Sequence, residues 1–291
     1  MALNRLDHAT LRVGDLGAAC AWYGDGLGLD VLSRDATRAD LGVADDHVDL
    51  TLVTGGAGLE SFAFGVDDGA RLSSYVERLA GAGVATEHSS DPRPGVSEGV
   101  SFQLPSGHRM EIQTGTADRQ AGRHNESWDG SSCAPLDLDH INLVTADVAG
   151  LMEFFESTLD IRPTYIFPTP DGGLFGVWSR SSDYHHDVAF ISVPGFGDAF
   201  HHLAFKVDGI RHMEIVADSL ADLGHDLEFG PGRHPEINLF TYMLDPAGNR
   251  IELSAEMPLI PSGQPPVTLA PDTRMNAWSP TVPESFLTQA T

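Results

Sequence analysis

Leu-Asp-His-Ala-Thr-Leu-Arg-Val at residues 6–13 and Leu-Asp-His-Ile-Asn-Leu-Val at residues 138–144 are two copies of one pattern. Both alternate apolar and polar residues, as a half-buried β-strand does. A helical stretch follows each copy, and its aromatic residue stands 14 positions after the histidine, Trp22 after His8 and Phe154 after His140. The sequence therefore repeats a strand-and-helix unit.

The second half of the unit repeats as well. Leu-Glu-Ser-Phe-Ala-Phe-Gly-Val at residues 59–66 aligns with Phe-His-His-Leu-Ala-Phe-Lys-Val at residues 200–207, and helical segments at 71–82 and 210–223 follow. Pro-Ser-Gly and Pro-Ala-Gly turns then precede the closing strands. The alignment has no gap here, because 50 positions separate Ser61 from Glu111 and also His202 from Glu252.

A duplication of this long period predicts an α+β fold of two tandem domains. We expect a first domain at residues 1–117, a polar, aperiodic linker at 118–134 and a second domain at 135–258. The tail at 259–291 is rich in proline and too irregular for a helix. We therefore expect it to lie extended over the second domain.

The composition excludes several classes of protein. Forty-two acidic against 17 basic residues give a net charge of -25, which would repel nucleic acid and anionic lipid. No apolar run is long enough to span a bilayer, and the N-terminus lacks the pattern of a secretory signal. Two cysteines are too few for a disulfide framework or a thiolate metal site. We expect a cytoplasmic protein with neither nucleic acid nor membrane as a partner.

Three potential metal ligands occupy repeated positions of the second unit: His140, His202 and Glu252. Two imidazoles and one carboxylate on one face of a divalent ion suit non-haem Fe(II), because the other face stays open. A lone histidine in a strand is more often hydrogen-bonded than metal-bound, but three ligands in matching register reverse that expectation. In the first unit Ser61 replaces the second histidine, so we predict that the first domain binds no metal.

Two adjacent histidine pairs leave a choice of residue. Neighbours in a strand face opposite ways, so only one of His201 and His202 should enter the site. We choose His202 and expect His201 to face away. His185 and His186 pose the same choice.

These motifs together resemble the vicinal oxygen chelate superfamily and, within it, the two-domain type I extradiol catechol dioxygenases related to homoprotocatechuate and catechol 2,3-dioxygenases. They are Leu-Asp-His-Ile-Asn, His-Asp-Val-Ala, His-His-Leu-Ala-Phe, Gly-Pro-Gly-Arg-His and the run from Tyr242 to Glu252. The resemblance implies two tandem vicinal oxygen chelate domains of paired βαβββ modules. It also implies Fe(II), with Mn(II) as the alternative metal, held by His140, His202 and Glu252. A catechol and O2 would be the small-molecule partners, and a homo-oligomer, dimer or tetramer, is the implied assembly.

The resemblance also implies roles for residues around the metal. His186 matches the family's acid/base histidine, His234 the histidine that contacts a substrate hydroxyl, and Tyr242 the tyrosine that hydrogen-bonds at the metal-bound oxygen. Asn142 and Trp178 match substrate-side positions. Phe229 stands where the related subgroup carries a carboxylate-binding arginine, which favours a catechol with a neutral or apolar substituent. Arg274 in the tail is a candidate substrate contact or a plain surface residue.

Two other functions stay open at this point. One is a metal-dependent isomerase or lyase of the glyoxalase type, and the other is a metal-free binding protein of the same superfamily. Glyoxalases draw their ligands from both halves of paired modules and have no need of His186, His234 and Tyr242 together. Binding proteins of this superfamily are short and lack the ligands.

Overall fold

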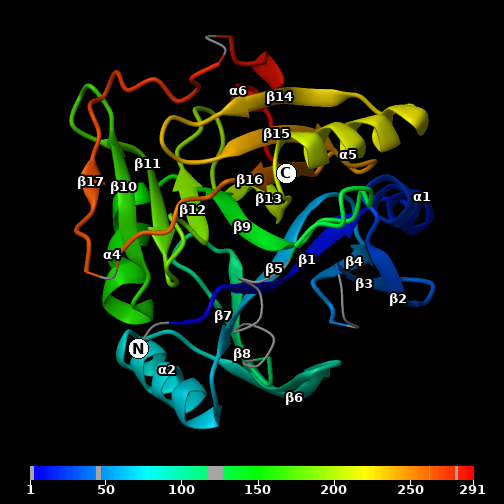
Figure 1. The fold of residues 1–291 in the computed structure, drawn as a ribbon. Helices are drawn as coiled ribbons and strands as arrows, with labels where there is room; N and C mark the ends of the chain where they lie inside the picture. The colour runs from blue at the N-terminus through cyan, green and yellow to red at the C-terminus, as the bar shows by residue number, and fades with distance from the viewer. Residues whose placement is uncertain (1–2, 44–46, 117–126, 262, 279–280) are drawn as a thin grey trace.

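Two mixed β-sheets, each flanked by helices, make up the protein in a computed structural model (Figure 1). The structure describes residues 3–43, 47–116, 127–261, 263–278 and 281–291. In the first domain the elements are β1 (Leu6–Val13), α1 (Leu16–Ala21), the π-helix η1 (Trp22–Gly26), β2 (Asp30–Arg34), β3 (Arg38–Gly42), β4 (Leu50–Thr54), β5 (Gly58–Val66), α2 (Gly69–Gly81), β6 (Glu87–Arg93), β7 (Val96–Gln103) and β8 (Arg109–Thr114).

The second domain repeats this order. Its elements are β9 (Asp137–Val144), α4 (Val148–Leu159), β10 (Arg162–Pro168), β11 (Leu174–Arg180), β12 (Val188–Ile191), β13 (Ala199–Lys206), α5 (Ile210–Asp222), β14 (Leu227–Arg233), β15 (Leu239–Leu244) and β16 (Arg250–Ala255). The tail adds β17 (Val267–Thr268) and α6 (Glu284–Thr288).

The strand order confirms the predicted duplication. Within the described residues the first sheet runs β2-β3-β4-β1-β5-β8-β7-β6, and the second runs β10-β11-β12-β9-β13-β16-β15-β14 with β17 added beside β10. Each domain is thus two βαβββ modules joined through an antiparallel pair, β1 with β5 and β9 with β13. The predicted α+β fold with paired modules is correct.

Aspartates start three of the helices. Asp15 accepts hydrogen bonds from the amides of Gly17 and Ala18, and Asp68 and Asp147 cap α2 and α4 in the same way. An aspartate at this position satisfies amide groups that have no partner inside the helix. In three of the four modules, the helix that follows the first strand therefore begins directly after an aspartate.

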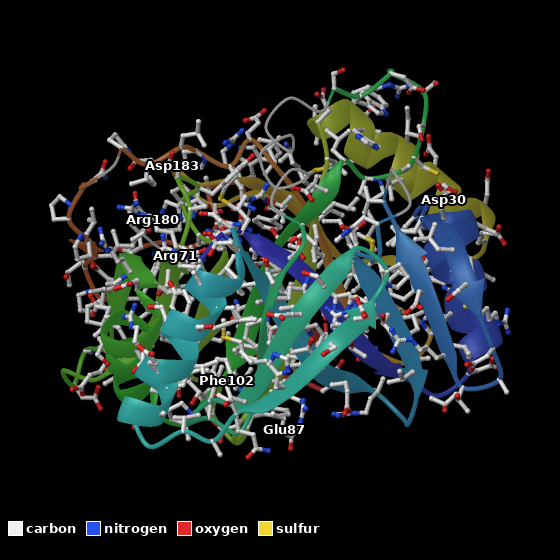
Figure 2. The ribbon with its side chains drawn as sticks, turned by 90° about the horizontal axis from the view of Figure 1, so that it is seen from below. Asp30, Arg71, Glu87, Phe102, Arg180 and Asp183 are labelled. Carbon is white, nitrogen blue, oxygen red and sulfur yellow. The ribbon has the colours of Figure 1, made fainter. Side chains whose placement is uncertain are left out.

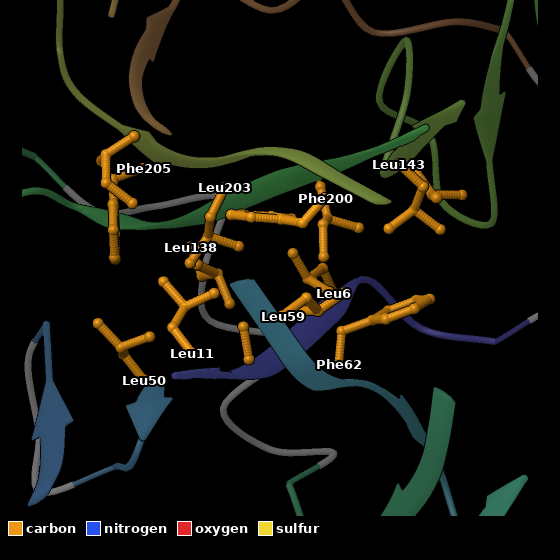
Figure 3. Packing of buried hydrophobic residues seen from close by; sticks show 14 of the residues in the cluster. Leu6, Leu11, Leu50, Leu59, Phe62, Leu138, Leu143, Phe200, Leu203 and Phe205 are labelled. Carbon is orange, nitrogen blue, oxygen red and sulfur yellow. The ribbon is translucent and has the colours of Figure 1, made fainter. Parts of the chain in front are cut away.

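The two domains share one hydrophobic core. Leu6, Leu11, Leu59 and Phe62 of β1 and β5 face Leu138, Phe200 and Leu203 of β9 and β13 (Figure 3). Further out, α2 packs on β7 and β8 and also contacts α4 of the second domain (Figure 2). The central strands of the second sheet are therefore backed by the first domain.

The tail covers the second domain. β17 pairs with β10, and the main chain of Thr291 exchanges hydrogen bonds of 2.6 and 3.0 Å with that of Phe200. The expectation that the tail contains no helix is wrong, because the tail forms the short helix α6. Pro283 stands before the first residue of this short helix with an extended backbone (φ -57°, ψ 145°), and Glu284 starts the helix.

Residues 118–126 of the predicted linker lie outside the described residues. Beyond them, the Trp128 ring stacks on His212 of α5 at 4.5 Å between ring centroids. None of the described helices combines the length and the apolar character needed to cross a membrane.

Candidate active site

Three neighbouring strands of the second sheet bring the predicted metal ligands together. His140 on β9 and Glu252 on β16 both pair in register with Ala204 on β13, which lies between them. His202 lies two residues before Ala204 and thus on the same face of β13. The small alanine side chain leaves room above the central strand for the three larger ones.

The ligand atoms converge on one point. Glu252 Oε2 lies 3.2 Å from His140 Nε2 and 3.0 Å from His202 Nε2. One ligand atom from each residue lies within 4.8 Å of the others, and all three residues are buried. Such a cluster of two imidazoles and a carboxylate can hold a divalent ion on one side.

Hydrogen bonds at the Nδ1 atoms of both histidines leave their Nε2 atoms directed at Glu252 Oε2, where a metal would bind. Asp139 Oδ2 lies 3.0 Å from His140 Nδ1, so the ring donates from Nδ1 because a carboxylate only accepts. His201 Nε2 donates to the Phe286 carbonyl at 3.4 Å, which leaves its Nδ1 to accept from His202 Nδ1 at 2.7 Å. Partners of this kind fix the orientation and tautomer of metal-binding histidines.

The outer oxygen of Glu252 is held by a residue that the sequence analysis missed. Asn238 Nδ2 donates to Glu252 Oε1 at 2.9 Å and to Ser254 Oγ at 3.0 Å, and Asn238 is buried. This asparagine stands in the turn before β15, where the strand pattern alone does not separate it from an ordinary turn residue. Its amide leaves Glu252 Oε2 to face the histidines.

The charges of the metal-free cluster follow from its burial. Burial would lower the pKa of His140, but the Glu252 charge and the hydrogen bonds to Asp139 and Glu252 outweigh it and raise that pKa to about 9. Burial would raise the pKa of Glu252, but the neighbouring imidazoles hold it well below its ordinary value. Burial lowers the pKa of His202 to about 4. At neutral pH the metal-free cluster therefore holds one extra proton, on His140. A bound cation would replace that proton.

The adjacent histidines depart from the expected alternation. The expectation that His201 faces away from His202 is wrong, because their Nδ1 atoms are only 2.7 Å apart. A register shift between Phe200 and His202 interrupts the pairing of β13 with β9 at this point. Such a bulge re-aims side chains, and here it brings both imidazoles to one side.

His186 lies directly beside the ligands, just before β12. Its ring centroid is 4.3 Å from that of His140 and 6.4 Å from that of Trp178. Burial and the charge of His140 hold the pKa of His186 well below its ordinary value. His186 therefore has a neutral imidazole that can both donate and accept a proton.

His234 and Tyr242 form a second group at the cluster. His234 Nδ1 donates to the Met275 carbonyl at 2.7 Å, so its Nε2 is left to accept from the Tyr242 hydroxyl at 3.3 Å. Burial and the Glu252 charge raise the pKa of Tyr242 well above its ordinary value. Tyr242 is therefore a neutral hydrogen-bond donor.

The predicted substrate contacts Asn142, Trp178 and Arg274 have different surroundings. Asn142 pairs in register with His202, and its buried Oδ1 has no hydrogen-bond partner among the described atoms. Trp178 packs on Phe167, with ring centroids 4.1 Å apart. Arg274 is exposed and lines a cavity of about 240 Å³ together with His234, Phe167 and Met275.

An aromatic group surrounds Phe229. Its ring lies 5.0 Å from Phe240, 6.2 Å from Tyr242 and 5.3 Å from Phe286, between ring centroids. Phe286 comes from α6 of the tail and also lies 4.7 Å from Tyr242. The sequence analysis missed Phe286, since no periodic pattern relates the tail to β15.

The corresponding position of the first domain holds an ion pair. His8 and Glu111 pair in register with Ala63, as their counterparts do in the second domain. Ser61 Oγ donates to Glu111 Oε1 at 2.7 Å, and Arg93 Nη2 donates to Glu111 Oε2 at 2.5 Å. His8 is hydrogen-bonded to Thr51 at 2.9 Å. The metal-free first domain stays a prediction, and the Arg93 cation gives it a physical reason.

Two curated relatives and a solved structure are similar to this chain. Metapyrocatechase 2 from Cupriavidus necator is 26% identical over 98% of this chain and 92% of its own length. Metapyrocatechase from Pseudomonas sp. (strain CF600) is 29% identical over 86% of this chain and 85% of its own. Homoprotocatechuate 2,3-dioxygenase from Brevibacterium fuscum, solved with 3,4-dihydroxyphenylacetate, superposes with a TM-score of 0.87 at 27% identity, covering 100% of this chain and 93% of that one.

The family comparison covers both domains. Residues 5–112 and 137–253 each match the family described as Glyoxalase/Bleomycin resistance protein/Dioxygenase superfamily. These two ranges contain the repeated modules and all three candidate ligands. The chain belongs to this superfamily.

Proposed function

We propose that this protein is an Fe(II)-dependent dioxygenase that cleaves the ring of a catechol beside its two hydroxyl groups. The observation that carries the proposal is the buried cluster of His140, His202 and Glu252. Both histidines offer Nε2 and the carboxylate offers one oxygen, which fits a ferrous ion held on one face. The similar metapyrocatechases and the homoprotocatechuate enzyme support the same activity. Mn(II) is the other metal that this donor set would accept.

A bound ferrous ion would supply the redox chemistry, because it can bind a catechol and O2 together on its open side. The chain's own residues then orient the substrate. Tyr242 is kept neutral by burial beside Glu252, so its hydroxyl can donate to a substrate oxygen. Asn142 Oδ1 is buried without a partner and can accept from a substrate hydroxyl. His234, whose Nε2 faces Tyr242, lies where it can accept from a second hydroxyl.

His186 would move the proton. Its low pKa keeps the imidazole neutral at pH 7, so it can donate to negative charge that develops on the substrate side and pass a proton there during turnover. Its ring lies 4.3 Å from that of His140, between centroids, which places it beside the ligand cluster. Burial around it excludes bulk water as a competing acid.

The substrate substituent follows from Phe229. Its apolar ring packs among Phe240, Tyr242 and Phe286 and offers no cation to a carboxylate. Arg250 is a nearby cation, but its Nε and Nη2 atoms donate hydrogen bonds to the Glu228 carboxylate at 2.6 and 2.9 Å. We therefore propose a catechol with a neutral or apolar substituent.

The two other functions have less support from the geometry. All three candidate ligands come from one domain, and His186, His234 and Tyr242 adjoin them. An isomerase of the glyoxalase type would not require that second group, and a binding protein would not require the ligands. The implied dimer or tetramer stays a prediction.

The decisive experiment is anaerobic reconstitution with Fe(II), followed by O2 uptake with a panel of catechols. We expect one O2 consumed per ring and a yellow ring-opened product. The variant H202A should lose both iron and activity, while S61A, its counterpart in the first domain, should keep both. An iron-loaded protein that leaves every catechol intact, or that isomerises the methylglyoxal–glutathione adduct instead, would refute the proposal.

A further inference from the structure

His185 is a buried imidazole for which the proposed function gives no role. It precedes His186 by one residue and is 1% exposed. Its backbone amide donates to the Pro258 carbonyl at 2.9 Å, and its ring lies edge-on to Tyr165 at 4.4 Å between centroids. The side chain is thus fixed by its neighbours on both sides.

The two rings meet through the same type of nitrogen. His185 Nδ1 lies 3.1 Å from His186 Nδ1, which is a hydrogen-bond distance. One hydrogen fits between these atoms, so one ring donates from Nδ1 and the other accepts there. The accepting ring must then carry its hydrogen on Nε2.

The surroundings of His185 Nε2 decide which of the two rings donates in the Nδ1–Nδ1 hydrogen bond. This atom is buried and has no hydrogen-bond partner among the described atoms. If His186 donated, His185 would carry a buried N–H without an acceptor, which is strongly unfavourable. The charge of Arg180 also acts on His185, and burial together with His140 and Arg180 lowers the pKa of His185 to about 3. A bare nitrogen near this cation is favoured over an N–H group.

We propose that His185 is a positioning residue that donates from Nδ1 to His186 Nδ1 and so keeps the hydrogen of His186 on Nε2. The nitrogen of His186 that is left for the substrate then begins each turnover as a donor. This inference rests on the proposed role of His186 in the dioxygenase reaction. It assigns His185, which the sequence left as an alternative to His186, a separate function.

The tautomer can be measured without turnover. In ¹⁵N-histidine-labelled protein loaded with Zn(II) as a diamagnetic probe, two-bond ¹H–¹⁵N spectra report which ring nitrogen carries hydrogen, and loss of signals in H186F assigns them. We expect His186 of the unsubstituted protein to be protonated on Nε2 only. A hydrogen on His186 Nδ1 would overturn the inference, and the variant H186F is needed only to assign the signals.

Two variants separate the role of Nδ1 from that of ring volume. The amide of H185N can donate from about the place of Nδ1, whereas that of H185Q reaches toward the place of Nε2. With Fe(II) and the best catechol, we expect H185N to keep kcat close to that of the unsubstituted protein. H185Q should lose about tenfold to a hundredfold in kcat with little change in KM, as for other residues that orient a catalytic group. Equal kcat in H185Q and H185N would contradict the proposal.

His47 provides the matched control. It stands three residues before β4, as His185 stands three residues before β12, and it is buried next to the Asp7 carbonyl at 3.3 Å. H47Q should leave kcat and the His186 tautomer unchanged. If the unsubstituted protein cleaves no catechol, the proposed function fails but the tautomer measurement still tests His185. If it cleaves catechols and H185Q does too at full rate, only the inference about His185 fails.

Discussion

Buried Arg93 and half-buried Glu111 form an ion pair of 2.5 Å at the register position where the second domain gathers two imidazoles around a carboxylate. R93M should therefore lower the free energy of unfolding by about 3 kcal/mol, because it leaves the Glu111 charge mostly buried without a cation. Activity per bound iron should not change, since the pair lies in the other domain. Urea denaturation and iron-normalised O2 uptake test both statements.

The double variant R93M/E111L is the control for this pair. It removes both charges, so it should recover most of the lost stability. Iron loss in R93M would show that the first domain takes part in metal binding, and would contradict the prediction that the first domain binds no metal.

The sequence predicted the fold because the duplication is visible in the residues themselves. The match of His8, Ser61 and Glu111 with His140, His202 and Glu252 put one candidate ligand on each of three predicted strands, and the structure shows that these strands are neighbours. It also placed His186, His234 and Tyr242 near one another, through the family resemblance, and the structure brings them to the cluster.

The partners of the ligands were beyond the sequence for physical reasons. Asn238 lies in a turn and Phe286 in the tail, and neither position has a counterpart in a repeated pattern. Strict alternation also failed at His201, because a bulge is a local irregularity that polar and apolar spacing does not reveal.

Asn238 should control metal affinity without being a ligand. N238A removes the 2.9 Å hydrogen bond to Glu252 Oε1 and frees the carboxylate to rotate. We expect Fe(II) or Mn(II) affinity to fall about tenfold to a hundredfold, as for other partners of metal ligands. Competition with a coloured chelator measures this change. The first-domain variant S61A keeps the bond between Asn238 and Glu252 and should bind metal normally; equal affinity in N238A and S61A would rule out this role.

Metal binding should strengthen as the pH rises. In the metal-free protein the pKa of His140 is raised to about 9, and that of His202 is lowered to about 4. Between these values one proton must leave His140 for each ion bound, so apparent affinity should rise about tenfold per pH unit. Anaerobic Mn(II) titrations from pH 6 to pH 8 test the slope. A flat response would mean that His140 is already neutral before the metal binds.

His186 should affect turnover and not metal content. H186F removes the neutral imidazole beside His140 while keeping an aromatic ring of similar size. We expect kcat to fall by about 10² to 10⁴, the usual contribution of a general acid or base. Iron content by colorimetric assay should stay at that of the unsubstituted protein. Unchanged kcat with full iron content would remove His186 from the proposed mechanism.

Phe229 should set the preference between neutral and acidic catechols. Its ring lies among three other aromatic rings, so a carboxylate placed there would lose water without gaining a cation, at a free-energy cost of about 2 kcal/mol or more. We therefore expect kcat/KM for 4-methylcatechol to exceed that for 3,4-dihydroxyphenylacetate by about thirtyfold or more, from the same free energy. F229R should raise kcat/KM for the acid and lower it for 4-methylcatechol, because the guanidinium can pair with the carboxylate. F229L is the matched control, since it keeps the site apolar and should keep the preference. An unsubstituted protein that favours the acid would show that another cation, such as Arg274 at the cavity beside His234, binds the carboxylate.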